Sequence, residues 1–293
     1  MRKDKVMAYI SIIRPANSLM VGTAVIIGVM LTSLQMVLSW KTLYGFLTGF
    51  FVSAFSMVVN DIYDVEVDKK NKLTRPLVVG IMRIKEAWIY AFILLIIGLV
   101  LSFATNIEAF MVATLFGFIS WWYNFTLKRH GIIGNMTVAL STSIPYIYGS
   151  MISTTKLSLA NIFQEAPLVP WFVGISFLAV TGREVIKTIS DIEGDQIREV
   201  RSIALWIGKR NAAKVGVTFF VLAILFTFGP YILGQAGIAY MIMILVPDVV
   251  FIYISYLILI DQSVKSVLYV KKLALFGMLL GFVAFVVGRV LMT

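Results

Sequence analysis

Long apolar stretches separated by short charged segments most restrict how this chain can fold. Each is about 20 residues long, which is the length that an α-helix needs to cross a bilayer. They lie at residues 16–34, 43–60, 86–104, 108–126, 132–152, 168–188, 212–230, 238–260 and 272–292. Of the 293 residues, 60% are hydrophobic, whereas a soluble domain has roughly 45–50% apolar residues. The sequence therefore predicts an all-α polytopic membrane protein with about nine transmembrane helices.

Nearly every segment is predicted to span, so we expect a single domain over residues 1–293, with one bundle around a central cavity open to the cytoplasmic side. The chain has no cysteine, which excludes disulfides and thiolate metal sites. The basic N-terminus precedes a long apolar run without a small-residue cleavage pattern. We therefore expect the first spanning helix to be retained.

The distribution of basic residues predicts orientation. If the nine stretches cross in turn, all but three of the 25 Lys and Arg residues fall on one side, and the exceptions are Lys41, Lys156 and Arg289. The positive-inside rule then places the N-terminus in the cytoplasm of a cell-membrane protein and the C-terminus outside. Because the net charge of +10 sits in membrane-flanking loops, it favours membrane lipids or a phosphorylated lipid as partners, and not nucleic acid.

Two groups of aspartates follow apolar stretches on this predicted cytoplasmic side. Asp61, Asp64 and Asp68 end the second stretch, and Asp191 and Asp195 end the sixth. At about 3.6 residues per turn, each set lies along one helix face. Carboxylates this close repel one another, so five unneutralised aspartates predict bound Mg²⁺, which prefers oxygen ligands and substrate phosphates. One or two ions gripped by both sets would suit a diphosphate.

Basic residues accompany both acidic motifs. Arg183, Lys187, Asp191 and Asp195 follow one another at four-residue intervals, which predicts a single stripe along the sixth helix. Others follow the first motif or the fourth stretch: Arg75, Lys128 and Arg129. Cations at these positions are suited to stabilising a departing diphosphate.

Three other features allow more than one interpretation. Asp248 follows Pro247 in the eighth stretch, so it either faces the bundle interior or a wet cavity, or it marks a displaced helix end. The run Trp-Trp-Tyr at 121–123 is either an aromatic belt at the membrane boundary or the lining of a cavity where rings stabilise a carbocation. His130, the only histidine, is a possible general base.

The two acidic motifs resemble the paired signatures of the UbiA-type intramembrane prenyltransferases, N-D-x-x-D-x-x-x-D beginning at Asn60 and a later D-x-x-x-D. Asn71 and Arg75-Pro76 resemble the family's N-x-x-x-R-P element. The resemblance implies Mg²⁺ as the cofactor, with Asp61, Asp64, Asp68, Asp191 and Asp195 as catalytic metal ligands. It also implies these substrate-binding residues: Arg14, Asn17, Asn60, Arg75, Tyr123, Lys128, Arg183, Lys187 and Arg198. One departure is that Tyr123 precedes Lys128 by five residues, where the family commonly has four.

Within that family, the run at 183–190 is most similar to the archaeal ether-lipid branch. This likeness implies Mg²⁺-dependent transfer of a geranylgeranyl group from geranylgeranyl diphosphate to the free hydroxyl of geranylgeranylglyceryl phosphate, a phosphorylated glyceryl ether lipid. The acceptor phosphate needs further cations, and the candidates are Lys128, Arg129, Arg198 and Arg201. The alternative within the family is a prenyltransferase of quinone or haem biosynthesis, which acts on an aromatic acceptor.

Two functions outside the family fit less well. A cation transporter is expected to carry ionisable groups near the membrane midplane, whereas nearly all of these lie at predicted helix ends. A phospholipid head-group phosphotransferase needs a D-G-x-x-A-R element, which the chain lacks.

Overall fold

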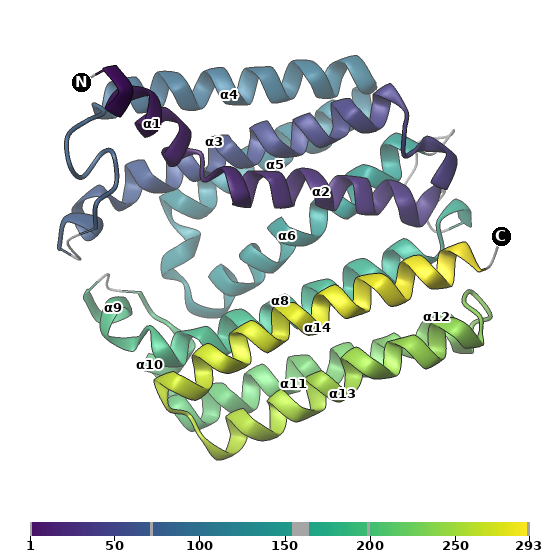
Figure 1. Ribbon diagram of the computed structural model, residues 1–293. Helices are drawn as coiled ribbons and strands as arrows, with labels where there is room; N and C mark the ends of the chain where they lie inside the picture. Colours follow the sequence, from purple (N-terminus) through teal and green to yellow (C-terminus); the bar gives the residue numbers. More distant parts are fainter. Residues whose placement is uncertain (1, 71–72, 154–163, 198–199, 292–293) are drawn as a thin grey trace. The chain divides into compact units, whose positions relative to one another are not determined.

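A computed structural model describes residues 2–70, 73–153, 164–197 and 200–291, and these residues form helices without any strand. The contacts divide the chain into two compact units (Figure 1). Unit 1 comprises Met1–Thr126 and Pro145–Leu157, and unit 2 comprises Leu127–Ile144 and Ser158–Thr293. The helix α6 (Gly131–Ser153) contributes its first part to unit 2 and its last part to unit 1. A single functional domain over the whole chain stays a prediction.

Unit 1 is built around the long helix α3 (Trp40–Lys70), against which its neighbours α2, α4 and α5 pack. The other helices of unit 1 are α1 (Arg2–Ile12), α2 (Pro15–Thr32), η1 (Leu34–Met36), α4 (Ile84–Thr105) and α5 (Ile107–Phe125). Apolar side chains of α3 such as Phe55, Val58 and Val59 form a core with Ala87 and Leu94 of α4. The first acidic motif therefore continues a helix that is anchored on several sides.

Glycines bring α2 and the last part of α6 into close contact. A Cβ atom at Gly149 would lie 2.0 Å from the carbonyl oxygen of Val25, and one at Gly28 would lie 2.1 Å from that of Tyr146. No side chain fits between backbones this close. Small residues at helix crossings are typical of membrane bundles, in which close packing replaces the hydrophobic effect between helices.

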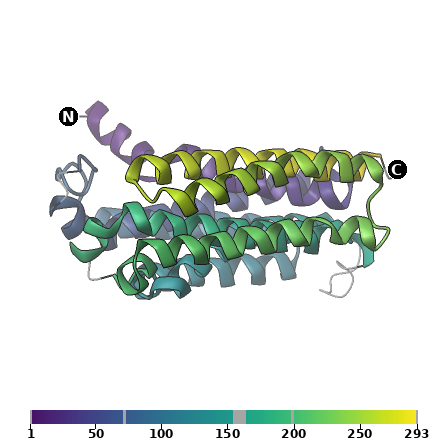
Figure 2. The same ribbon diagram turned by 90° about the horizontal axis from the view of Figure 1, so that it is seen from below.

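Unit 2 contains four long helices that lie alongside one another, as Figures 1 and 2 show. They are α8 (Leu168–Ser190), α11 (Lys209–Thr227), α13 (Ile238–Ile260) and α14 (Val264–Val290). Shorter helices connect or flank them: η2 (Leu127–Arg129), α9 (Ile192–Ile197), α10 (Ile203–Ile207) and α12 (Gly229–Ile232). Each long helix packs on two others, and fully buried Ile186, Phe220, Ile254 and Ile258 fill the centre. Unit 2 is thus a four-helix bundle with the second acidic motif at the end of α8.

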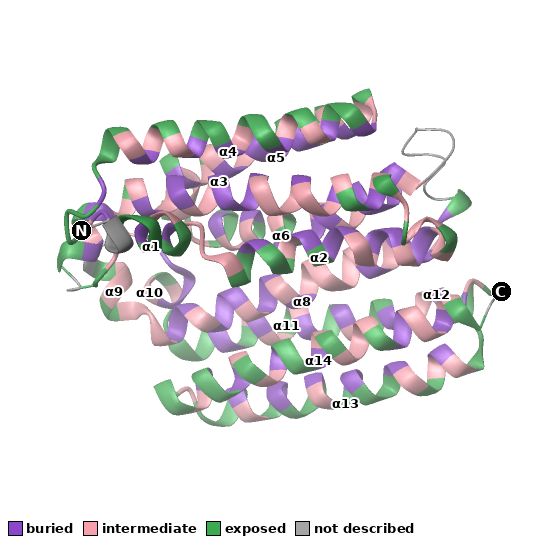
Figure 3. Ribbon diagram, turned by 45° about the horizontal axis from the view of Figure 1, so that its top comes forward, coloured by how far each residue is buried: buried purple, intermediate pink, exposed green. Residues whose placement is uncertain are grey.

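The described residues include seven helical segments that are long and apolar enough to cross a membrane. They correspond to α2, α3, α4, α8, α11 with α12, α13 and α14. The other two predicted crossings coincide with α5 and α6, which are not among these seven segments. Many large apolar side chains on α4, α13 and α14 are exposed (Figure 3), as expected for helices that face lipid. The membrane-helical class is confirmed, and the count of nine crossings stays a prediction.

Several boundaries differ from those expected. The helix α3 continues ten residues past the apolar stretch that ends at 60, and α14 begins at Val264 instead of 272. A search for apolar stretches misses these turns because they carry charged residues. Charged residues are nevertheless favourable at a helix end that lies in water. The short helices α1, α9, α10 and α12 were not predicted.

Candidate active site

The first acidic motif lies on the last turns of α3, which runs uninterrupted to Lys70. The prediction that its three aspartates share one helix is confirmed. Asp61 and Asp68 are 3% and 1% exposed, respectively, whereas Asp64 is half-buried. Burial therefore separates Asp64 from the other two carboxylates.

Two arginines neutralise the buried carboxylates. Arg14 Nη2 lies 2.5 Å from Asp61 Oδ1, and Arg75 Nη1 lies 2.9 Å from the same oxygen. Arg75 Nη1 also lies 2.7 Å from Asp68 Oδ2. The expectation of unneutralised carboxylates is therefore wrong for Asp61 and Asp68, because residue spacing alone does not show which basic side chains return to α3 from other segments.

Arg14 reaches α3 from the junction between α1 and α2. Its backbone has φ 44° and ψ 71°, in the left-handed region, which costs a non-glycine residue about 1–3 kcal/mol. The guanidinium contacts the carboxylate of Asp61 and also lies 3.3 Å from Asn60 Oδ1. These polar contacts compensate for the backbone strain and fix the cation beside the motif.

An amide pair joins the same motif to α5. Asn60 Nδ2 donates to Asn124 Oδ1 at 2.8 Å, and Asn124 Nδ2 donates to the carbonyl oxygen of Ser120 at 2.9 Å. Asn124 is 2% exposed, so its amide depends on these partners. The sequence analysis missed Asn124, although a single amide beside the aromatic run at 121–123 was an available signal.

The remaining predicted substrate-binding residues are spread over both units. Asn17 is exposed on α2 and Tyr123 is half-buried on α5, both in unit 1. Lys128 is half-buried in η2, which belongs to unit 2. Arg198 and Asn71 lie outside the described residues. The roles of these residues stay predictions.

The second acidic motif is divided between two helices. The helix α8 ends at Ser190, Asp191 follows as its C-cap with φ −100° and ψ 7°, and Asp195 belongs to α9. The predicted stripe from Arg183 to Asp195 on a single helix is therefore wrong. The Ser190 hydroxyl lies 2.8 Å from both the Lys187 carbonyl oxygen and Asp191 Oδ1, and such local bonds compete with the helical ladder. Asp195 N–H still donates to Asp191 O at 2.8 Å, which keeps the two aspartates one turn apart.

Glu184 holds both basic residues of α8. Arg183 Nη1 lies 2.7 Å from Glu184 Oε1, and Lys187 Nζ lies 3.0 Å from Glu184 Oε2. Glu184 is 7% exposed. Lys271 of α14 interacts electrostatically with Asp191 and with these three residues. The sequence analysis assigned no role to Glu184 or Lys271, because their positions depend on how α8 turns and packs against α14.

The carboxylates fit Mg²⁺ in their chemistry. In the described part of the chain, no three acidic or histidine side chains come together as a ready metal site. Asp64, Asp191 and Asp195 are half-buried and present hard oxygen donors. Mg²⁺ commonly takes one or two carboxylates together with water and substrate phosphates. The arrangement therefore suits an ion held jointly with a substrate, and not a cage made by protein alone.

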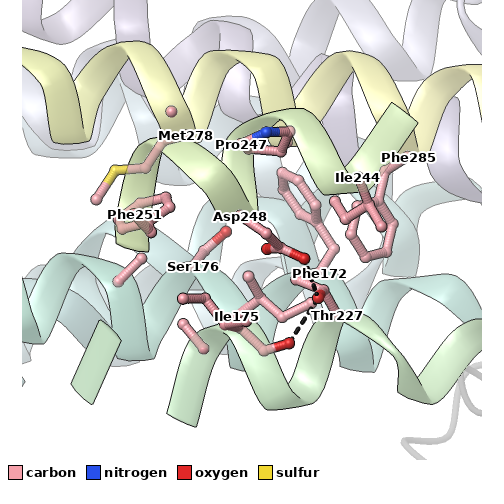
Figure 4. Close-up of a pocket in the computed structure, with 15 residues that line it drawn as sticks. Phe172, Ile175, Ser176, Thr227, Ile244, Pro247, Asp248, Phe251, Met278 and Phe285 are labelled. Carbon is pink, nitrogen blue, oxygen red and sulfur yellow. Dashed lines mark hydrogen bonds between the residues drawn. The ribbon is translucent and has the colours of Figure 1, made fainter. Parts of the chain in front are cut away.

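Asp248 lies in the interior of unit 2, on α13. That helix continues through Pro247, so the interpretation as a displaced helix end is wrong and the interior position is confirmed. Asp248 is 4% exposed. With Ser176 and Thr227 it provides the polar groups of a largely apolar cavity of about 40 Å³ (Figure 4). Thr227 Oγ1 lies 2.9 Å from Asp248 Oδ2.

Comparison with known proteins identifies the family. The model of the UbiA prenyltransferase family matches residues 20–276, which is most of the chain. The chain belongs to this family. The expected resemblance is thereby confirmed, and this UbiA-family member is a prenyltransferase and a multi-pass membrane protein.

Archaeal relatives match this UbiA-family chain over nearly its whole length. Digeranylgeranylglyceryl phosphate synthase of Methanosphaera stadtmanae is 30% identical, and the alignment covers 96% of this chain and 98% of the relative. The synthase of the same name from Methanocaldococcus jannaschii is 33% identical, with 98% of both chains covered. The predicted likeness to the archaeal ether-lipid branch is confirmed.

Solved structures agree with the fold. One from work on digeranylgeranylglyceryl phosphate synthase in membranes is 32% identical, with a TM-score of 0.84, and the match covers 98% of this chain and 99% of that one. A UbiA homologue from Archaeoglobus fulgidus bound to GPP and Mg²⁺ has a TM-score of 0.63 at 19% identity, covering 95% of this chain and 99% of that one. At that identity the second likeness concerns the fold alone.

Proposed function

We propose that this prenyltransferase transfers a geranylgeranyl group from geranylgeranyl diphosphate to the free hydroxyl of geranylgeranylglyceryl phosphate, and that it requires Mg²⁺. The bond between the prenyl carbon and the diphosphate oxygen breaks, and an ether bond forms between that carbon and the acceptor oxygen. The hydroxyl proton and diphosphate leave. The product carries the second ether bond of archaeal membrane lipids.

The observation that carries this proposal is the nearly full-length similarity to relatives named digeranylgeranylglyceryl phosphate synthase, at 30% and 33% identity. The chemistry of the residues at the two motifs also supports it. Both motifs supply carboxylates, and both are accompanied by fixed positive charge, from Arg14 and Arg75 in unit 1 and from Lys187 in unit 2.

Asp64, Asp191 and Asp195 are the residues that would hold Mg²⁺. They are the half-buried aspartates of the two motifs, whereas Asp61 and Asp68 are buried and paired with arginine. When bound, the ion would neutralise negative charge that develops on the departing diphosphate. Asp61 and Asp68 instead position Arg75, which ties them together.

Arg14 and Arg75 have the chemistry to bind the diphosphate itself. A guanidinium presents several N–H donors in a planar fork, which matches phosphate oxygens in pairs. Side-chain exposures of 31% and 29% leave each accessible despite its contact with Asp61. Each arginine is thus held by carboxylate on one side and open to a substrate anion on the other.

The acceptor phosphate requires further cations. Unit 2 supplies Arg129, Arg201 and Lys271 among its described residues, and the first two are joined by the backbone bond from Arg201 N–H to Arg129 O at 3.2 Å. An aromatic acceptor has less need of such a group. This charge surplus therefore supports the phosphorylated lipid over the aromatic alternative.

Product analysis tests the proposal. Purified protein with Mg²⁺, geranylgeranyl diphosphate and geranylgeranylglyceryl phosphate should release diphosphate and form digeranylgeranylglyceryl phosphate, measured by mass spectrometry. Chelation of Mg²⁺ should abolish the product. Prenylation of 4-hydroxybenzoate or a naphthoate, with none of the glyceryl phosphate, would overturn the proposal in favour of the aromatic-acceptor alternative.

The proposal places the N-terminus and both motifs on the cytoplasmic side of the cell membrane, as the positive-inside rule predicts. Because the chain has no cysteine, single cysteines can report this directly. Leu38, whose side chain is 98% exposed, is predicted to lie outside, and Lys69, whose side chain is 51% exposed, in the cytoplasm. Each is replaced by cysteine in turn. In intact cells an impermeant maleimide should label the first and spare the second. The reverse pattern would overturn this orientation.

A further inference from the structure

A second cavity of unit 2 has none of the aspartates of the two acidic motifs in its lining. It has a volume of about 920 Å³ and lies between the start of α6, the short helix α10 and α11. This is within the range of about 300–1,000 Å³ that is typical of small-molecule sites. We call it the Arg201 pocket, after the cation in its lining.

The walls of the Arg201 pocket are held together by backbone contacts. Arg201 N–H donates to the carbonyl oxygen of Arg129 at 3.2 Å. Gly131 has φ 47°, and a Cβ atom there would lie 2.4 Å from the carbonyl oxygen of Arg201. Only glycine combines that conformation with so close an approach. The segment before α10 is therefore fixed against the start of α6.

The lining is amphipathic. Most of it is apolar, including Ile133, Ile207 and Val215, while Arg201 and His130 supply the polar groups. No carboxylate pairs with Arg201 in the part of the chain that the structure describes. Trp206, also in the lining, is 84% exposed, and tryptophan is enriched at the level of lipid head groups. An anionic head with a hydrocarbon chain matches these walls.

The Arg201 pocket is adjacent to the second acidic motif along the chain. Val200 lines the pocket, and its N–H donates to the carbonyl oxygen of Asp195 at 2.9 Å. One short backbone segment thus connects a proposed metal ligand with the cation of the pocket. Occupation of the pocket is therefore in a position to affect the motif.

We infer that the Arg201 pocket binds a lipid phosphate, with the phosphate at Arg201 and part of the hydrocarbon chain against Trp206 and the isoleucines. Two lipids share this chemistry: the phosphorylated acceptor, in which case the inference rests on the proposed function, and an anionic membrane phospholipid. The charge of Arg201 serves both, because a guanidinium forms strong charge-assisted hydrogen bonds with phosphate.

Kinetics and lipid binding together test the pocket. Arg201→Gln removes the charge, and Lys209→Gln is a matched control, since Lys209 is exposed and lies outside the lining. If the acceptor binds there, Arg201→Gln should raise KM for geranylgeranylglyceryl phosphate about tenfold and leave KM for the diphosphate donor unchanged. Trp206→Ser should raise the acceptor KM by a smaller factor.

The second arm uses phosphatidylglycerol, added to detergent-solubilised protein. If a membrane lipid is the ligand, it should raise the Tm of the natural chain and of Lys209→Gln, but not of Arg201→Gln, and kinetics should be unaffected. An Arg201→Gln variant that matches the control in both arms would overturn the inference. Absence of turnover by the natural chain with the glyceryl phosphate would instead count against the proposed function, and the phosphatidylglycerol arm alone would then decide the pocket.

Discussion

Arg75 forms an ion pair with a carboxylate that has almost no access to solvent: its Nη1 lies 2.7 Å from Oδ2 of Asp68, which is 1% exposed. Removing one partner of a buried pair leaves an uncompensated charge, which typically costs about 3–5 kcal/mol. We expect Arg75→Gln to lower the free energy of unfolding by about 3 kcal/mol, near the low end, because Arg75 itself is partly exposed. Denaturant unfolding in detergent micelles measures this.

Two further variants distinguish the effect of losing this buried ion pair from the effect of losing any charged side chain. Lys69→Gln removes an exposed pair with Glu66, whose Oε1 is 2.8 Å from Lys69 Nζ, and should cost less than about 1 kcal/mol. Adding Asp68→Asn to Arg75→Gln should restore part of the lost stability, because residue 68 is then uncharged and Asp61 keeps its ion pair with Arg14. A double variant that is less stable than Arg75→Gln would contradict this account.

Asp64 is expected to behave differently from its neighbours on α3. It is half-buried, whereas Asp61 and Asp68 are buried and paired with arginine. Asp64→Asn should lower turnover by about 100-fold or more, with the free energy of unfolding changed by less than about 0.5 kcal/mol. Asp68→Asn should lower stability as well as turnover. Parallel assays of product and Tm distinguish the two, and an active Asp64→Asn variant would remove Asp64 from the proposed metal ligands.

Much of the fold could be predicted because a membrane-spanning helix requires a long apolar stretch, which can be recognised in the sequence. The predicted crossing at 238–260 coincides with α13 (Ile238–Ile260). The failures are at charged ends: α14 begins at Val264, where the Ser263 side chain accepts from Ser266 N–H and caps the helix. Lys265 and Lys271 lie in those added turns, and Lys272 follows directly. Capping and solvation, and not apolarity, set such ends.

The acidic motifs could be found from spacing, but their partners could not. Asp61 meets Arg14, 47 residues away in sequence, and Asn60 meets Asn124, 64 residues away. Such pairs depend on how helices cross, which periodicity does not encode. The break at Asp191 was missed for a related reason. A four-residue spacing is compatible with one helix or with two consecutive ones, and the bonds of Ser190 decide which.

The turn between α13 and α14 should respond to acid. Hydrogen bonds from the Ser266 hydroxyl, and from the backbone and hydroxyl of Ser263, hold the pKa of Asp261 below its usual range. A carboxyl whose pKa is lowered by folding stabilises the fold above its unfolded pKa, and the effect is lost as pH falls through the folded value. The protection of amides at the start of α14 against hydrogen exchange, relative to their intrinsic exchange rates, should therefore fall below about pH 4.

The Asp261→Asn variant is the control for that measurement. Its amide does not titrate in this range, so exchange at the Ser263 and Ser266 amides should lose the acid-dependent step. These amide groups contact Asp261 Oδ1 at 2.8 Å and Ser263 Oγ at 3.3 Å, respectively. If the variant keeps the same step as the natural chain, another group is responsible.

Thr227 has one hydroxyl hydrogen but two short contacts. Its Oγ1 lies 2.6 Å from the carbonyl oxygen of Ile224 and 2.9 Å from Asp248 Oδ2. In a regular α-helix the N–H of Phe228 would donate to the carbonyl oxygen of Ile224. Here it donates to the carbonyl oxygen of Phe226 instead, so the Ile224 carbonyl oxygen needs the Thr227 hydroxyl as a donor. We therefore expect Thr227 to donate to Ile224 and Asp248 to donate to Thr227. No cation lines the cavity around this carboxyl, which agrees with an uncharged acid.

Substitutions of Asp248 test this direction of donation. In Asp248→Asn the side-chain amide can still donate to Thr227, so the free energy of unfolding should change by less than about 1 kcal/mol. Asp248→Ala removes the donor and enlarges a cavity that already measures about 40 Å³, and should cost about 2 kcal/mol or more. Infrared difference spectra between the natural chain and Asp248→Asn should show loss of one protonated-carboxyl band. If asparagine is as damaging as alanine and no such band is lost, Asp248 is an acceptor, and the hydroxyl of Thr227 must turn away from Ile224.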